Sequence, residues 1–151
     1  STALCTDGDF FRYANKQHLF VFKQLNLGNQ GEAPIIASSW FISSEIGNPI
    51  VVLTRDLLYA YWQDYDYLLN YFTFHLFFTM ACRRYESEWE SIPAFNNNSP
   101  HMLMFELKRD YSPERWEQLM KMSGIHKLQR YDDYSDLKKS NYCKILDTYL
   151  Q

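Results

Sequence analysis

The sequence has 151 residues, of which 46% are hydrophobic and 18% aromatic, so it can bury a core and is not expected to be disordered. Fifteen basic and eighteen acidic residues give a formal net charge of −3, and no basic run is long enough to follow a phosphate backbone, which excludes nucleic acid as an expected partner. Cys5, Cys82 and Cys143 are too widely spaced for a disulfide framework or a paired-cysteine zinc site, so we expect reduced thiols in a cytoplasmic protein.

Residues 19–25 predict a strand or a short helix, and the residues that follow, 26–31, are typical of a turn. Residues 35–44 are rich in β-branched and aromatic side chains over a length that predicts a strand. Gly47-Asn48-Pro49 ends this strand.

Two consecutive helices are predicted next. Asn48 is a good N-cap and Pro49 suits the first helical position, so a helix should run from there to about Trp62. A second helix is expected from near Asp66, as its N-cap, to about Arg84. Its apolar part contains several polar residues and is shorter than the roughly 20 residues that a membrane span needs, so we expect a buried helix and no transmembrane segment.

The last third predicts shorter elements. Residues 96–100 have the composition of a loop. Ser112 as cap and Pro113 in the first turn predict a helix that Gly124 can end. A short extended segment at 125–131 and a final helix at 140–150 complete the expected elements.

Several sequence blocks occur together in an order that resembles a known family. These are Trp40-Phe41-Ile42-Ser43-Ser44 before Gly47-Asn48-Pro49, Arg55-Asp56-Leu57-Leu58, Tyr61-Trp62, Leu69-Asn70-Tyr71-Phe72-Thr73-Phe74-His75, Ile92-Pro93, Trp116 and Ile125-His126-Lys127-Leu128. In this order they resemble the second half of bacterial capsular polysaccharide synthesis glycosyltransferases, which are similar to glycosyltransferase family thirty-two. The resemblance covers residues 1–131, and it is based on the order of the blocks.

The resemblance implies a helix-rich α/β fold, namely the C-terminal part of a GT-A-like nucleotide-diphospho-sugar transferase with most of its sheet missing. Residues 1–151 would form a single domain. In the family, a Gly-Gly-x-Trp-x-Asp-(Ala/Ser)-Thr segment comes directly before this region, and Ser1-Thr2 resemble its end. We therefore expect the Asp of the metal and donor site to lie outside this sequence, and the chain alone to be inactive.

The implied activity is transfer of a sugar from a nucleotide-sugar donor to a capsular or cell-surface polysaccharide or a lipid-linked saccharide, on the cytoplasmic side of the membrane. Charge on the departing diphosphate must be stabilised, by manganese or magnesium held by carboxylates or by cationic side chains. Two alternatives remain open. The chain could be a noncatalytic helical interaction module, or a domain that binds glycans without chemistry.

His126 and Lys127 are the first candidates for the site. The resemblance implies that His126 contacts the metal or the diphosphate and that Lys127 neutralises charge on the leaving group. The alternative interpretation is a surface pair that flanks a short strand.

His75 and Glu45 are the candidates on the acceptor side. His75 stands where the family carries Asp or His and could bind acceptor hydroxyls, although a lone His on an apolar helix is also typical of a hydrogen-bonded core residue. Asn70 occupies the position of a family Asp, and an amide cannot act as a base at neutral pH. Glu45 follows the predicted strand and could contact an acceptor, or be a solvated loop residue.

Further polar and aromatic residues have simpler interpretations. Asp7 and Asp9 are typical of a solvated turn, and Asp64 and Asp66 of helix capping. Arg55 could reach a phosphate but is expected on an exposed helical face. Trp40 and Trp62 could stack on sugars, but packing is the expected role of both.

Overall fold

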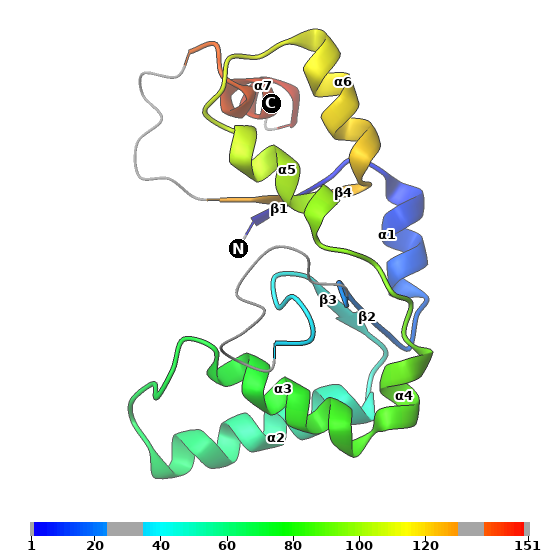
Figure 1. Cartoon of the computed structure of the whole chain (residues 1–151), viewed down its shortest axis with the longest axis vertical. Helices are drawn as coiled ribbons and strands as arrows, with labels where there is room; N and C mark the ends of the chain where they lie inside the picture. Colours follow the sequence, from blue (N-terminus) through cyan, green and yellow to red (C-terminus); the bar gives the residue numbers. More distant parts are fainter. Residues whose placement is uncertain (1, 24–34, 130–137, 150–151) are drawn as a thin grey trace. The chain divides into compact units, whose positions relative to one another are not determined.

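The computed structural model describes residues 2–23, 35–129 and 138–149. Within them the chain forms seven helices and four short strands (Figure 1). The strands make two two-stranded antiparallel sheets, so the predicted helix-rich fold with little sheet is confirmed. The turn predicted at 26–31 lies outside the described residues.

The chain divides into two compact units, and the boundary falls inside the first helix, α1 (Gly8–Asn15). Residues 13–97 form what we call the central unit, and residues 1–12 together with 98–151 form the terminal unit. Each has its own hydrophobic core. The prediction that the chain is a single domain stays a prediction.

The central unit combines a small sheet with a helix pair. Strand β2 (Leu19–Val21) pairs with β3 (Ile42–Ser44), with Leu19 opposite Ser44. Helices α2 (Pro49–Asp64) and α3 (Thr73–Arg84) run antiparallel, and the short α4 (Glu86–Ser91) follows (Figure 1). The core contains Leu19, Val21, Ala37, Ile50, Phe78, Ala81, Cys82 and Ile92.

Asn48 fixes the start of α2, as the sequence predicts. Its side-chain oxygen accepts hydrogen bonds from the backbone N–H groups of Ile50 (3.1 Å) and Val51 (3.3 Å). Its amide nitrogen donates to the carbonyl of His18 (3.3 Å) and to the carboxylate of Glu88 (3.0 Å). Because this buried residue satisfies both helix donors and two neighbouring elements, it ties α2 to the start of β2 and to α4.

Two boundary predictions in the central unit are wrong. The strand expected at 35–44 is confined to 42–44. The helix expected from Asp66 begins only at Thr73, and no side chain caps it. The intervening loop is stabilised instead by the Tyr61 hydroxyl, which donates to the carbonyl of Tyr67 and accepts from the Leu69 N–H (3.1 Å). These tertiary contacts outweigh the helical propensity of the loop residues.

The terminal unit places helices against its own strand pair. Strand β1 (Thr2–Cys5) pairs antiparallel with β4 (Ile125–Leu128). Helix α5 (Asn98–Glu106) packs on β4, and α6 (Pro113–Met122) and α7 (Asn141–Tyr149) complete the unit. The core contains Leu4, Leu103, Leu107, Leu119 and Ile145.

The predictions for the last third of the chain are mostly confirmed. Ser112 caps α6 by accepting from the Arg115 N–H (3.4 Å), and the extended segment and the final helix are both present. The loop predicted at 96–100 is wrong in part, because α5 already begins at Asn98. At Gly124 a Cβ atom would lie 2.6 Å from the Cβ of Phe10, so the close approach of α1 to β4 requires glycine.

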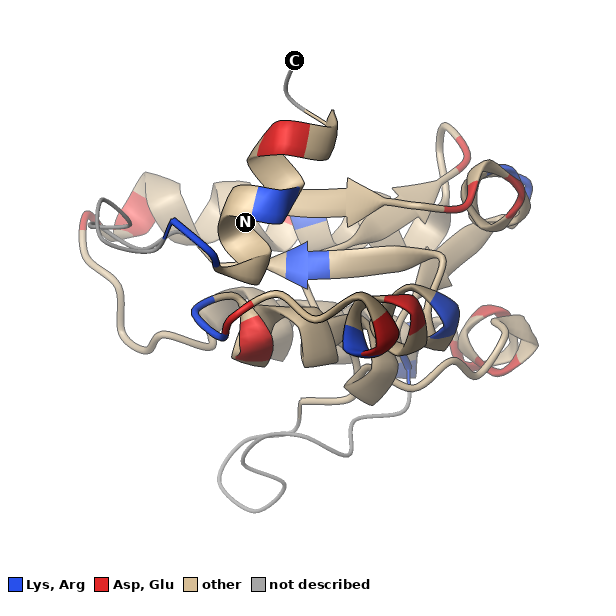
Figure 2. Cartoon of the chain, turned by 90° about the horizontal axis from the view of Figure 1, so that it is seen from above, with Lys and Arg blue, Asp and Glu red and all other residues tan. Residues whose placement is uncertain are grey.

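Among the described helices, none is long and apolar enough to cross a membrane. Lys and Arg are scattered among Asp and Glu and are not gathered on one element (Figure 2).

Candidate functional site

His126 lies on β4 in the interior of the terminal unit. Its side chain is fully buried, and neither ring nitrogen makes a hydrogen bond. Burial lowers the pKa of His126 to about 4. The imidazole is therefore neutral at pH 7, with two polar atoms that lack a partner.

Lys127 is half-buried beside it. Burial lowers the pKa of Lys127, and among the described residues no carboxylate lies within ion-pair distance of its ammonium. A partly desolvated ammonium without a counter-ion favours an anionic ligand more strongly than a fully solvated one. This is the property that charge neutralisation on a diphosphate requires.

The two candidates nevertheless point to opposite faces of the strand pair. Leu4 lies opposite His126 in the antiparallel register, so both side chains are on the face that packs into the helical core. Ala3 lies opposite Lys127 on the other face. His126 and Lys127 are adjacent in sequence, but their side chains cannot contact the same part of a ligand, because they lie on opposite faces of the strand pair.

The described residues do not by themselves fit the metal that the resemblance implies. They contain no group of three His, Cys, Asp or Glu side chains close enough to hold an ion. Manganese and magnesium favour several oxygen ligands, whereas His126 offers one buried imidazole. The unpartnered ring nitrogens of His126 are compatible with a ligand role.

His75 lies in the first turn of α3. It is half-buried, its Nδ1 is buried without a hydrogen bond, and burial lowers its pKa. The rings of Phe72 and Phe74 contact it edge-on, with centroids 5.5 and 5.6 Å away. The neutral ring can accept a hydrogen bond from a hydroxyl group, and the aromatic neighbours hold it in place.

Glu45 is exposed directly after β3. Its carboxylate is 2.8 Å from Nδ1 of His18, which raises the pKa of that histidine. Helices α2 and α3 run antiparallel, so the start of α3, where His75 lies, is beside the end of α2; there the rings of Tyr61 and Phe77 are in contact, with centroids 5.8 Å apart. Glu45 precedes the start of α2, at the opposite end of this helix pair. A 16-residue helix is about 24 Å long, so the two acceptor-side candidates are not brought together.

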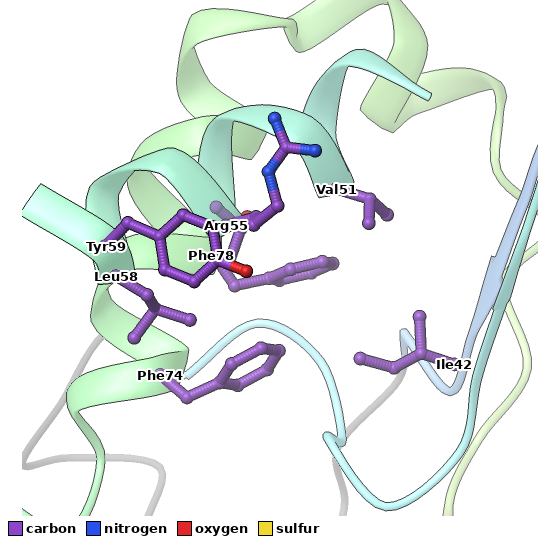
Figure 3. Close-up of a pocket in the computed structure, with 8 residues that line it drawn as sticks. Ile42, Val51, Arg55, Leu58, Tyr59, Phe74 and Phe78 are labelled. Carbon is purple, nitrogen blue, oxygen red and sulfur yellow. The ribbon is translucent and has the colours of Figure 1, made fainter. Parts of the chain in front are cut away.

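A cavity of ≈ 190 Å³ lies between α2, α3 and β3. Its walls are mostly apolar, with Ile42, Phe74 and Phe78 around the open space (Figure 3). The Arg55 guanidinium points away from Phe74, and it binds the carboxylate of its neighbour Asp56 at 2.9 and 2.7 Å. The cavity therefore suits an apolar group better than a hydroxyl-rich sugar.

The other sequence candidates have local roles. The Asp7 carboxylate accepts from the Asp9 N–H at the start of α1 (2.8 Å), and Asp9 pairs with Arg12 (2.7 Å). Trp40 stacks on Phe22 with ring centroids 5.0 Å apart, as expected for packing. Trp62 is exposed on α2.

The sequence does not indicate the buried ion pair of the terminal unit. Glu106 is almost inaccessible, and the Arg115 guanidinium donates to both carboxylate oxygens at 2.5 to 3.2 Å. Arg115 lowers the pKa of Glu106. Nothing in the spacing of nine residues marks such a pair, because it forms only when α5 and α6 pack together.

The sequence profile described as capsular polysaccharide synthesis protein matches residues 1–146. No curated protein and no solved structure matches the sequence.

Proposed function

Because the chain belongs to the capsular polysaccharide synthesis protein family, we propose that it is part of an enzyme that transfers a sugar from a nucleotide-sugar donor to a capsular or cell-surface glycan. The family match is the evidence for a role in capsule synthesis. The glycosyl transfer and the GT-A-like relationship are our extension of it, from the ordered sequence blocks described above.

Lys127 is the residue that best supports this proposal. Transfer from a sugar nucleotide breaks the bond between the sugar and the diphosphate, and the departing nucleoside diphosphate gains a negative charge on its terminal phosphate. This developing charge is best stabilised by positive charge in a water-poor environment. Lys127 offers a half-buried ammonium with no carboxylate partner among the described residues. His126, neutral and buried on the opposite face, would then position β4 or bind a donor group through a small rearrangement.

We further propose that the complete enzyme uses manganese or magnesium, and that carboxylates outside the described residues supply the ligands. We assign no step to the metal. The acceptor would be a polysaccharide or a lipid-linked saccharide, handled on the cytoplasmic side of the membrane. Glu45 and His75 are proposed acceptor contacts, although their separation allows at most one of them to touch the reacting hydroxyl.

The test is release of nucleoside diphosphate by the complete gene product, supplied with a panel of sugar nucleotides and Mn²⁺. Lys127→Ala should lower kcat about a hundredfold, as loss of one charge-stabilising group commonly does, while Lys127→Arg keeps part of the rate. Lys121→Ala is the matched control, because that exposed lysine of the same unit forms a solvent-exposed ion pair with Glu117. Full activity of Lys127→Ala would remove its role.

One observation favours a noncatalytic alternative. Since the described residues gather no metal-binding group, the chain could act as an interaction or glycan-binding module. Such a module would bind saccharide without releasing nucleoside diphosphate from any donor.

A further inference from the structure

An exposed aromatic and aliphatic loop joins α2 to α3. Six large side chains at the end of α2 and in this loop face solvent: Trp62, Tyr65, Tyr67, Leu68, Leu69 and Tyr71. Leu68 and Leu69 are 63% and 68% exposed and Tyr71 is 87% exposed, values unusual for side chains of this size that occur together. We call residues 62–71 the aromatic loop.

We propose that the aromatic loop is a membrane-surface contact that inserts into the headgroup region of a lipid bilayer. The side-chain types fit this environment. Tyr and Trp combine an apolar ring with a polar edge and are enriched at membrane interfaces, and the adjacent leucines can enter the boundary with the acyl chains.

The position of the loop also fits. Helix α2 leads away from the β2–β3 sheet, so the loop lies at the far end of the helix pair (Figure 1). A protruding tip can enter a bilayer without moving the core of the central unit.

Hydrogen bonds from neighbouring side chains hold part of the loop backbone in place, so the exposed side chains are presented by an ordered segment. The Tyr61 hydroxyl bridges the Tyr67 carbonyl and the Leu69 N–H. The side chain of Asn70 accepts from the Phe72 N–H (2.8 Å), and the Thr73 hydroxyl donates to the Asn70 carbonyl (2.6 Å).

The charged residues near the loop indicate which lipid composition it should bind. From Asp56 to Cys82 the sequence contains no Lys or Arg, and two exposed carboxylates, Asp64 and Asp66, lie within the aromatic loop itself. Attraction to anionic lipid therefore contributes nothing at this site, and apolar and aromatic burial drives the contact. Binding should be insensitive to salt and should not require anionic lipid.

The test uses the full chain and sedimentation with vesicles of phosphatidylcholine, so it does not depend on glycosyl transfer. We expect binding that persists between about 0.05 and 0.5 M salt, since screening weakens only charge-driven contacts. Leu69→Asp should lower the partition coefficient at least tenfold. Ile46→Asp is the control, because it places the same charge at a fully exposed aliphatic residue of the central unit outside the loop.

Three results would overturn the proposal. The first is no sedimentation with vesicles, and the second is equal loss in Leu69→Asp and Ile46→Asp. The third is that light scattering shows a dimer which Leu69→Asp dissociates. This result would mean that a second copy of the chain, and not a bilayer, covers the aromatic loop. Circular dichroism of both variants ensures that a loss of binding is not a loss of fold. If vesicles bind but no donor is hydrolysed, the proposed function fails and the membrane contact stands.

Discussion

The two units bury different kinds of side chain. Among the described residues, the buried polar groups of the central unit are neutral Asn and Thr, whereas the terminal unit buries Glu106, His101 and His126. A neutral aromatic core is insensitive to pH, but a buried ionisable group makes stability depend on its protonation. Acid should therefore act more strongly on the terminal unit, where His126 is fully buried, than on the central unit, where burial also lowers the pKa of His75 but the ring is only half-buried. The predictions below test this difference.

The largest effect is expected in the aromatic core of the central unit. Phe20 is fully buried, and its ring centroid lies 5.5, 5.9 and 5.4 Å from those of Phe22, Phe41 and Phe95. Phe20→Ala should cost about 3–5 kcal/mol of unfolding free energy, through lost burial and the cavity left behind. Urea denaturation at pH 7 and at pH 5 measures it, and the loss should be the same at both.

Tyr71→Ala is the control for this prediction. It removes a similar ring from a position that is 87% exposed, so its cost should stay within about 0.5 kcal/mol. A comparable loss from both variants would show that the Phe20 cluster does not form the core of this unit.

The second effect concerns His126, whose pKa is lowered by burial from 6.5 to about 4. Between these values the unfolded chain binds a proton that the folded chain does not, so stability falls as the pH falls. The drop from pH 6.5 to pH 4 should reach about 3 kcal/mol, because each tenfold difference in proton affinity between the two states contributes about 1.4 kcal/mol. Hydrogen exchange of peptides from 98–129 should show it, and peptides from 42–64 should not.

His126→Leu tests the assignment, because it fills a similar volume without a titratable group. This variant should flatten the slope between pH 6.5 and pH 4. His18→Gln, which removes an exposed histidine of the central unit, should not flatten the slope, because the raised pKa of His18 stabilises the folded chain as the pH falls. An unaltered slope in His126→Leu would mean that another group causes the acid sensitivity.

The sequence predicts elements well where the deciding interaction is local. Asn48-Pro49 and Ser112-Pro113 carry their caps within three residues, and both helix starts are confirmed. The predicted start of α3 is wrong because a hydroxyl from α2, on Tyr61, stabilises the preceding loop. Helix α5 begins in an Asn-rich segment whose composition is that of a loop.

From the sequence, only the residue types of the candidate site can be predicted, and not their burial or their partners. The block around His126 and Lys127 predicts the strand, but a sequence pattern does not show that one ring is fully buried and unpartnered. The Glu106–Arg115 pair depends on how two helices pack, so no motif reveals it. The sequence places most of the aromatic loop in a buried helix, because apolar composition looks the same whether protein or lipid covers it.

The smallest expected effect belongs to Glu106, and it separates the two acid-sensitive groups of the terminal unit. Arg115 lowers the pKa of Glu106 below its usual 4.5. The unfolded carboxyl therefore takes up a proton at a higher pH than the folded one. The pair stabilises the unit fully above pH 4.5 and progressively less as the pH falls through the folded pKa. Glu106→Gln should cost about 2 kcal/mol at pH 7, the range for a hydrogen bond to a charged group, and the cost should vanish in strong acid.

Glu117→Gln in the neighbouring α6 is the matched control, because its pair with Lys121 is exposed and screened by solvent, so its loss should cost much less than that of the Glu106 pair. Urea midpoints at pH 7 and pH 3 measure both variants. Equal costs at pH 7 would show that burial of Glu106 does not strengthen its pair. Since His126 acts between pH 6.5 and pH 4 and Glu106 only below 4.5, the free energy of unfolding of the terminal unit should fall in two successive pH ranges. Removing either group should abolish only the fall in its own range.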